Sequence, residues 1–361
     1  MQRDDSSHPG PYETLSFEGS LAGGADMSLV LANGNLLTFG RNDKNQLARN
    51  GNNLIPTIAP VGVDLIQMAA GTSHGIGITT DKKLLIWGSN AFGQANNDDG
   101  TAFIDSSVGN AILVAAGAYS SYVINDDGEF YVKGRNHLGQ LGLGDTNQRN
   151  EWVQNNFLPA GNIEQISAGI EYVLVLINGS LYGFGSNGFR QLGLSTSESI
   201  VTNPTLVDDV NNNIVLIHAG GFNSLCSDSN NNLYGMGKNT DGQMGLGNNS
   251  ATVGLSQISL PGSFDRVSAL AGGFEHSIVV VEDDSNITRV IVSGSNEYGQ
   301  LGIDGVTGVN RFTNIDHSIN NVEDVAATHY GTLILDRDGR LLGTGRIDGV
   351  TKSFHILGNV K

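Results

Sequence analysis

The chain contains little cysteine, little proline and little positive charge for its 361 residues. It has one cysteine, Cys226, and seven prolines, and its 19 Lys and Arg residues stand against 36 Asp and Glu residues, a formal net charge of −17. A single cysteine excludes an intramolecular disulfide, so the fold must rest on packing. We expect Cys226 to be a small buried residue of a strand.

The scarcity of cations argues against nucleic-acid binding. Phosphate recognition needs clustered Lys and Arg side chains, and the densest stretch, residues 337–346, holds only three arginines. We therefore expect protein partners and no nucleic acid. The negative charge would keep the protein soluble or steer it toward a basic partner.

Long apolar runs are also absent. No stretch approaches the roughly 20 residues of a membrane span, and the first 16 residues are polar, with Asp4, Asp5 and Pro9, unlike a secretory signal. We expect no membrane insertion and synthesis in the cytoplasm.

Side chains for catalysis or metal binding are present but scattered. None of the eight histidines pairs with another at i, i+2 or i, i+4, and acidic pairs such as Asp98-Asp99 lie in expected turns without the spacing of a calcium loop. The Gly-Leu-Gly stretches at 142–144 and 245–247 lack the Lys-Ser or Lys-Thr of a phosphate loop. We expect no enzyme activity, no cofactor and no metal.

What the chain has instead is an internal repeat. A pattern Gly-x-Asn-x-x-(Gly)-Gln follows a hydrophobic hairpin six times, as in KGRNHLGQLGLG at 133–144 and SGSNEYGQLG at 293–302, and a seventh hairpin has a decayed tail. The opening glycines fall at 40, 88, 134, 185, 237, 294 and 345. Periods of this size are typical of stacked or radial repeats.

Each period predicts a small antiparallel sheet. A first strand ends in a small-residue step such as Ala69-Ala70-Gly71, and a second apolar strand ends in a turn such as Asn33-Gly34 or Asn178-Gly179, pairs that favour hairpins. A third strand, as at 84–87 or 181–184, ends at the periodic glycine. We expect a fourth, outer strand near 58–63, 152–156, 205–210 and 353–357.

The Ala-Ala-Gly step, the hairpin ending in Trp-Gly or Phe-Gly and the Gly-Gln-Leu-Gly tail resemble the regulator of chromosome condensation repeat family over about residues 17–358. That resemblance implies an all-β fold, a seven-bladed β-propeller of four-stranded antiparallel blades, and we expect residues 1–361 to form one domain. There is no Trp-Asp dipeptide at blade period and no kelch-type pattern.

Departures from the family pattern fall mainly at the two ends. Blade 1 has Asn45 where glycine is usual, and blade 7 has Thr328 at the end of its small-residue step. A closed ring leaves no free edge. We expect strands near 12–17 and 353–357 to close it.

The periodic asparagines and glutamines have a structural interpretation. An asparagine side chain can bond the backbone two residues on and tolerates left-handed geometry, so we assign both residue types to the scaffold. His74 and His276 share a position three residues past a step glycine. We expect them to pack or to form hydrogen bonds near the inner strand.

Two sets of residues are candidate binding positions. The residue four past the periodic glycine is apolar or aromatic in several blades, and its ring of side chains favours either packing between blades or an interface anchor; this set is Phe92, Leu138, Phe189 and Tyr298. The second set is on the extended hairpin of blade 6, where irregular loops favour binding as much as neutral drift: Glu282, Asp283, Asp284 and Arg289.

Three classes of function remain open. A rigid scaffold with large loop faces and no convergent catalytic set favours a non-enzymatic protein-interaction or structural module. The resemblance implies an alternative, a guanine-nucleotide exchange factor for a small GTPase, although the wedge insertion of such relatives is absent after Trp87-Gly88 unless the blade 6 hairpin replaces it. A propeller lyase or hydrolase is the third class. Few lysines and many Asn, Gly and Ser residues would also suit a component of a larger assembly, such as a virus particle or a bacterial appendage.

Overall fold

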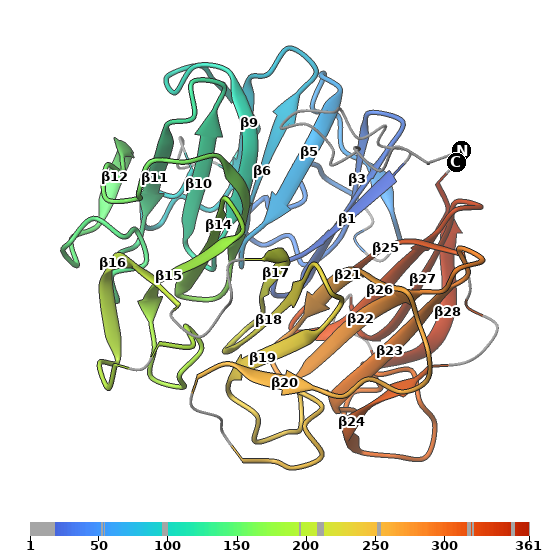
Figure 1. Ribbon diagram of the computed structural model, residues 1–361. Helices are drawn as coiled ribbons and strands as arrows, with labels where there is room; N and C mark the ends of the chain where they lie inside the picture. The colour runs from blue at the N-terminus through green and yellow to red at the C-terminus, as the bar shows by residue number, and fades with distance from the viewer. Residues whose placement is uncertain are drawn as a thin grey trace, which may run out of the picture.

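The computed structural model contains seven four-stranded antiparallel sheets arranged around a central axis (Figure 1). It describes residues 19–51, 53, 55–95, 100–194, 196–207, 213–250, 254–315, 319, 321–347 and 351–360, with the backbone alone for 351–355. The predicted fold class, a seven-bladed β-propeller, is confirmed. That residues 1–361 form a single domain stays a prediction.

The first four blades span residues 19–206. Blade 1 consists of β1 (Gly19–Gly23), β2 (Met27–Ala32), β3 (Asn35–Gly40) and β4 (Thr57–Ile58). Blade 2 consists of β5 (Leu65–Ala70), β6 (His74–Thr79), β7 (Leu84–Gly88) and β8 (Phe103–Asp105). Blade 3 consists of β9 (Ala111–Ala116), β10 (Ser120–Asn125), β11 (Phe130–Gly134) and β12 (Arg149–Gln154). Blade 4 consists of β13 (Ile163–Ala168), β14 (Tyr172–Ile177), β15 (Ser180–Ser186) and β16 (Ile200–Leu206).

The last three blades complete the ring. Blade 5 consists of β17 (Ile214–Ala219), β18 (Asn223–Asp228), β19 (Leu233–Gly237) and β20 (Ser256–Ile258). Blade 6 consists of β21 (Arg266–Gly272), β22 (His276–Glu282), β23 (Thr288–Ser295) and β24 (Gly308–Asn314). Blade 7 consists of β25 (Val322–Ala327), β26 (Tyr330–Asp336), β27 (Arg340–Arg346) and β28 (Thr351–Asn359).

The second strand of each blade is the most deeply buried. All six residues of β2, β6, β10 and β14 are buried, because neighbouring blades cover both faces of each sheet. A strand covered on both faces has a continuous apolar run in place of an alternating one. This explains the apolar run that the sequence shows before turns such as Asn178-Gly179, which follows β14.

The outer strands were the least well predicted. β12 begins at Arg149 and β16 at Ile200, whereas the sequence placed them at 152–156 and 205–210, and β4 ends at Ile58, where 58–63 was expected to begin. β8, β20 and β24 were not assigned at all. Outer strands pair on one side only and expose much of their length, as both residues of β4 do, so their apolar pattern is weak.

The first strands line the central channel, and their small residues allow the blades to approach closely there. A Cβ added to Gly71 would lie 2.5 Å from the carbonyl oxygen of Gly117 in the next blade. In blade 7, where Thr328 replaces this glycine, the close approach is made by Gly23 of blade 1, whose Cβ would lie 1.9 Å from the Ala327 oxygen. The Ala-Ala-Gly step is therefore a requirement of packing around the axis.

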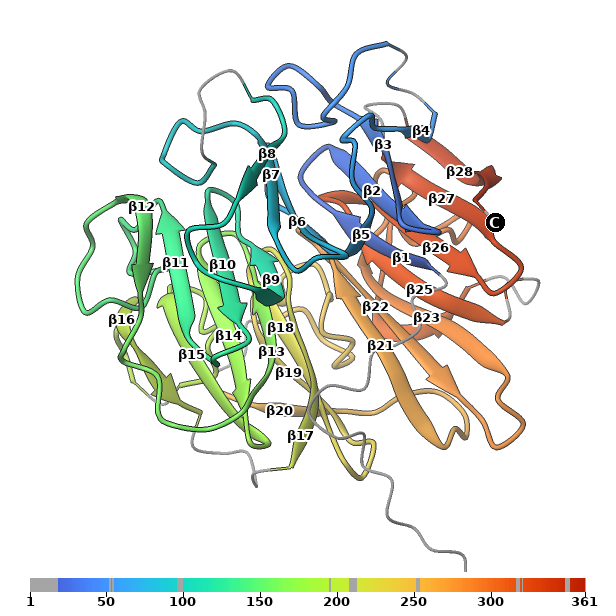
Figure 2. The ribbon, with the colours of Figure 1, turned by 90° about the horizontal axis from the view of Figure 1, so that it is seen from above.

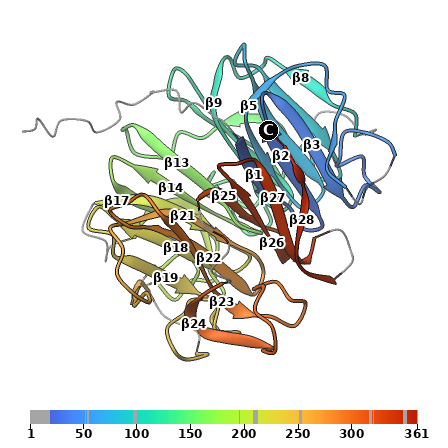
Figure 3. The ribbon, with the colours of Figure 1, turned by 90° about the vertical axis from the view of Figure 1, so that its right-hand side faces the viewer.

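Blade 1 closes the ring against blade 7 by packing and hydrogen bonds. β1 to β3 lie beside β25 to β28 in two further views (Figures 2 and 3), and Phe39 of blade 1 shares a buried cluster with Leu333 and Leu341 of blade 7. The backbone N–H of His329 donates to Ala25 O at 3.2 Å. The expected strand at 12–17 lies outside the described residues, and 353–357 belong to β28, which pairs with β27 within blade 7.

Each blade sends its connections to two faces of the ring. Because successive strands are antiparallel, the turn after the first strand and the loop after the third strand emerge on one face, which we name the loop face. The hairpin after the second strand and the connection to the next blade emerge on the opposite face, which we name the hairpin face. All Gly-x-Asn loops therefore lie on the loop face.

Candidate functional site

The loop after each third strand begins at a glycine whose backbone conformation no other residue type adopts easily. Gly88 has φ +88°, and a Cβ there would lie 2.5 Å from Ser73 O in the preceding turn. Positive φ with a close backbone contact is where glycine is required. The seven opening glycines all have positive φ, from +81° at Gly345 to +117° at Gly294.

The asparagine and the glutamine of the motif then hold the loop in shape. Asn136 Oδ1 accepts a hydrogen bond from the N–H of Leu141 at 2.8 Å, and Gln140 Oε1 accepts one from the N–H of Leu138 at 2.9 Å. Five other loops repeat both bonds. The scaffold role predicted for these residues is confirmed.

One detail of that prediction is wrong. The asparagine bonds the backbone five residues on, not two, and it does not adopt the left-handed conformation. The residue five past the opening glycine adopts it instead, including Asn45 at φ +56° and Arg190 at φ +64°, where other blades have glycine. The asparagine side chain can reach an N–H five residues on because the loop folds back between these two residues.

This geometry places the predicted ring residues on the loop face, where three of them contact another ring. Phe92, Phe189 and Tyr298 each pack against a ring that lies just before, or at the first residue of, the second strand of the following blade. The ring centroids lie 5.0 Å apart for Phe92–Tyr119, 5.2 Å for Phe189–Phe222 and 4.9 Å for Tyr298–Tyr330. Leu138, the fourth predicted residue, is half-buried on the corresponding loop of blade 3.

The partner rings were missed in the sequence. Phe222 also contacts Phe274 at 5.1 Å, and Phe274 stacks on Tyr330 at 6.0 Å. A continuous line of rings thus crosses blades 4 to 7, and we name it the aromatic arc: Phe189, Phe222, Phe274, Tyr330 and Tyr298. The sequence does carry a signal for these rings. They lie one or two residues after the small-residue step, at positions where the residue type varies between blades, as it does at the loop position.

Charged side chains accompany the rings. The guanidinium of Arg135 lies over Phe92 at 4.9 Å and over Tyr119 at 5.5 Å, and it pairs with Glu171 of blade 4 at 3.3 Å. Two blades further on, Lys238 holds the equivalent place and pairs with Glu275 at 3.5 Å.

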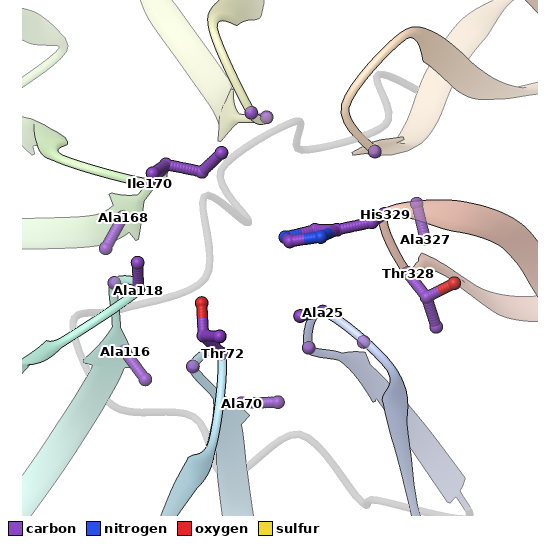
Figure 4. A pocket seen from close by; sticks show the side chains of 18 of the residues that line it. Ala25, Ala70, Thr72, Ala116, Ala118, Ala168, Ile170, Ala327, Thr328 and His329 are labelled. Atoms are coloured by element: carbon purple, nitrogen blue, oxygen red, sulfur yellow. The ribbon is translucent and has the colours of Figure 1, made fainter. Parts of the chain in front are cut away.

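The loop face surrounds the mouth of the central channel, a cavity of about 70 Å³. Its walls are the small residues at the ends of the first strands, and the side chains of Ile170 and His329 point into it (Figure 4). His329 lies edge-on to Phe274 with centroids 4.3 Å apart, and burial lowers the pKa of His329 to about 4. The imidazole is therefore neutral at pH 7.

The second predicted set, on the blade 6 hairpin, lies on the hairpin face, away from the aromatic arc. The backbone N–H of Asp283 donates to Ile287 O at 3.2 Å, which closes a compact turn between β22 and β23. Glu282 is buried and pairs with Arg266, while Arg289 Nη2 donates to Ser263 O at 2.6 Å. Asp284 is exposed at the tip.

The buried histidines and the cysteine have structural roles, as predicted. His74 Nε2 and Ser121 Oγ of the next blade are hydrogen-bonded at 3.0 Å, and His276 Nε2 bonds Thr332 Oγ1 in the same way at 3.1 Å. Cys226 is buried within β18.

Among the residues that the structure describes, no group of three or more His, Cys, Asp or Glu side chains is placed to hold a metal ion. The same residues include no helix suited to crossing a membrane.

The geometry defines a propeller whose sequence repeats match a known family. Models of the regulator of chromosome condensation (RCC1) repeat match residues 65–94, 127–176 and 178–227. These three stretches of the chain are therefore repeats of the regulator of chromosome condensation type.

Individual relatives cover the chain to different extents. The ultraviolet-B receptor UVR8 of Arabidopsis thaliana is 27% identical over 321 residues, 83% of this chain and 71% of UVR8. The probable E3 ubiquitin-protein ligase HERC4 of Rattus norvegicus is 32% identical over 52% of this chain, which spans only 19% of HERC4. The structure of Prp20p from Saccharomyces cerevisiae superposes with a TM-score of 0.80 at 17% identity, covering 92% of this chain and 86% of that one.

Proposed function

We propose that the chain is a non-enzymatic protein-binding propeller that docks its partner on the loop face. The observation that carries this proposal is the aromatic arc, which runs through blades 4 to 7 beside the channel mouth. Aromatic side chains are enriched among the residues that anchor protein interfaces. Phe189 retains 43% exposure at one end of the arc, so a partner can reach it.

The test compares two faces of the same protein. We would crosslink tagged protein to its partners in the source material, using Phe189→Glu on the loop face and Ile287→Glu on the hairpin face. Both residues are exposed, Ile287 to 49%, so both variants should fold. We expect Phe189→Glu alone to lose the partners that the unmodified protein captures. Loss with Ile287→Glu alone would contradict the proposal.

A second candidate is nucleotide exchange on a small GTPase. It is supported by the likeness to Prp20p, whose structure was reported with its binding properties to Gsp1p and histones. The compact turn of the blade 6 hairpin does not favour it, since that hairpin was the expected substitute for a wedge. Accelerated release of labelled nucleotide from a panel of small GTPases would establish this function, and its absence would remove it.

We also propose that the chain acts within a larger assembly, such as a virus particle or a bacterial appendage, after synthesis in the cytoplasm. The supporting observation is its composition, with 50 glycines and only 19 Lys and Arg residues. Purification of intact assemblies from the source, followed by detection of the chain, tests this proposal. A chain found only as a free monomer would contradict it.

A further inference from the structure

The three aromatic pairs of the loop face are copies of one arrangement in alternate blades. In each pair, a ring from the loop of blade 2, 4 or 6 meets a ring at the start of the second strand of blade 3, 5 or 7. The interplanar angles are 54°, 52° and 51° for Phe92–Tyr119, Phe189–Phe222 and Tyr298–Tyr330. The pairs differ in ring type, in the contact that Phe274 makes with Phe222 and Tyr330, and in the charged groups around them.

The first pair shows what such a pair binds. Arg135, the residue after the opening glycine of blade 3, covers both Phe92 and Tyr119 and is held by Glu171. A guanidinium within about 6 Å of a ring centroid is attracted by the ring face. Its planar shape also allows it to stack while it pairs with a carboxylate.

Among the described residues, the second pair has no guanidinium over it, and a further ring, Phe274, lies with its centroid 5.1 Å from that of Phe222. Lys238 replaces Arg135, but its ammonium lies 2.8 Å from Asp241 and 3.5 Å from Glu275. No Lys or Arg of the described part of the chain lies over Phe189 or Phe222.

The charge around this second pair favours a cation. Two carboxylates, Asp241 and Glu275, share one ammonium, which leaves a local excess of one negative charge. The Glu275 side chain is 28% exposed and can accept another donor. At the third pair, by contrast, burial and the Glu275 carboxylate raise the pKa of Tyr330, and the nearby Arg346 opposes that rise, so a cation of the chain already stands beside this pair.

We propose that the Phe189–Phe222 pair, together with Glu275, binds one arginine side chain of the protein partner. The proposal rests on the proposed function, since it names the chemistry of the group that docks on the loop face. The partner's guanidinium stacks on the two rings as Arg135 does on Phe92 and Tyr119. Glu275 then takes the part that Glu171 plays for Arg135.

The experiment uses three short Gly-Ser peptides that differ only at a central arginine, lysine or citrulline. Ligand-observed NMR titrations measure their affinity for the whole protein. We expect the arginine peptide to bind best, because lysine lacks the planar group and citrulline lacks the charge. Phe189→Ala should weaken arginine-peptide binding by about threefold to tenfold, while the hairpin-face control Ile287→Ala should leave it unchanged.

Two further variants test whether the first and second aromatic pairs are equivalent. Lys238→Arg should place the chain's own guanidinium over Phe189 and Phe222 and so remove arginine-peptide binding. Arg135→Ala should uncover Phe92 and Tyr119 and add a second binding site. Circular dichroism would verify that each variant is folded.

Equal binding of the arginine, lysine and citrulline peptides would overturn the proposal, as would arginine-peptide binding that survives Phe189→Ala unchanged. Neither result depends on the partner-capture test. If Phe189→Glu abolishes partner capture and the arginine peptide shows no preference, the loop face binds the partner by other means. If the peptide binds and partner capture is unaffected, the proposed function fails and the arginine site stands.

Discussion

Asp324→Gln should make the stability of the contact between blades 7 and 1, the seam that closes the ring, insensitive to pH. Asp324 Oδ2 accepts a hydrogen bond from the backbone N–H of Leu21 in blade 1 at 2.7 Å, and Oδ1 accepts one from Val325 N–H at 2.8 Å. The same place between blades 2 and 3, and between blades 4 and 5, is taken by a neutral side chain. There Gln67 and Gln165 accept from the N–H of the next blade at 2.9 and 3.0 Å.

The carboxyl group makes this seam different from the other two. Desolvation by burial raises the pKa of Asp324 from 3.8 to about 7, and the nearby Glu323 carboxylate adds to the rise. In the unfolded chain, Asp324 loses its proton near pH 4, whereas in the folded chain it keeps the proton until about pH 7. The unfolded state therefore binds fewer protons between these values, and the free energy of unfolding falls as the pH rises through this window.

The size of the effect follows from the shift. A shift of about 3 pKa units corresponds to at most about 4 kcal/mol at pH 7 and above, and to nothing below pH 4. Asp324 is only partly buried, so we expect about 1–3 kcal/mol. Gln, which this chain already uses at the equivalent seams, accepts the Leu21 hydrogen bond without this cost.

The assay is urea unfolding of the unmodified protein and Asp324→Gln at pH 4.0 to 8.5. The variant should gain stability relative to the unmodified protein as the pH rises from 4 to 7, with a plateau above. Gln165→Glu is the matched control, because it introduces a carboxyl group at the seam of blades 4 and 5 and should create a similar dependence. A stability difference between Asp324→Gln and the unmodified protein that stays constant over this range would refute the reasoning.

Three other substitutions test the scaffold. Gly88→Ala should cost about 1–3 kcal/mol and lower Tm in calorimetry, because φ is +88° and the new Cβ would meet Ser73 O at 2.5 Å. Desolvation lowers the pKa of His74 to about 4, so the unfolded state takes up the proton first and the unmodified protein should lose stability in urea unfolding as the pH falls from 6.5 to 4. His74→Tyr should abolish this pH dependence. Burial lowers the pKa of Lys133 to about 8, so the folded state loses its proton before the unfolded state does and the unmodified protein should gain stability above pH 8 in the same assay. Lys133→Met should abolish this gain.

The repeat made the blades predictable because the same local requirements recur in every blade. Gly88 and its equivalents need positive φ, and the Asn and Gln after them clip the loop, so residue type and spacing together identify each third strand and its loop. The outer strands lacked such requirements. β8 and β20 have three residues each, with one partner strand and no obligatory glycine, and the sequence carried no comparable signal for them.

The candidate site was half predictable for a related reason. Phe189 and Tyr298 stand at a fixed place in the repeat, so the sequence put them on one ring. Their partners Phe222 and Tyr330 lie about 30 residues further along the chain, and only the packing of one blade on the next brings them together. The separation of the blade 6 hairpin from this ring could have been inferred, because connections of antiparallel strands alternate between two faces.

The way each loop is built also explains why its binding chemistry can differ from blade to blade. The glutamine of the motif accepts its hydrogen bond from the backbone N–H of the residue four past the opening glycine, and this bond is the same whether that residue is Lys44, Phe92 or Asp241. The loop therefore keeps its shape while that side chain remains free to change. The residue after the opening glycine varies in the same way, from Arg135 in blade 3 to Lys238 in blade 5. Fold and recognition thus depend on different positions of one repeat, and partner choice can change there at little cost to stability.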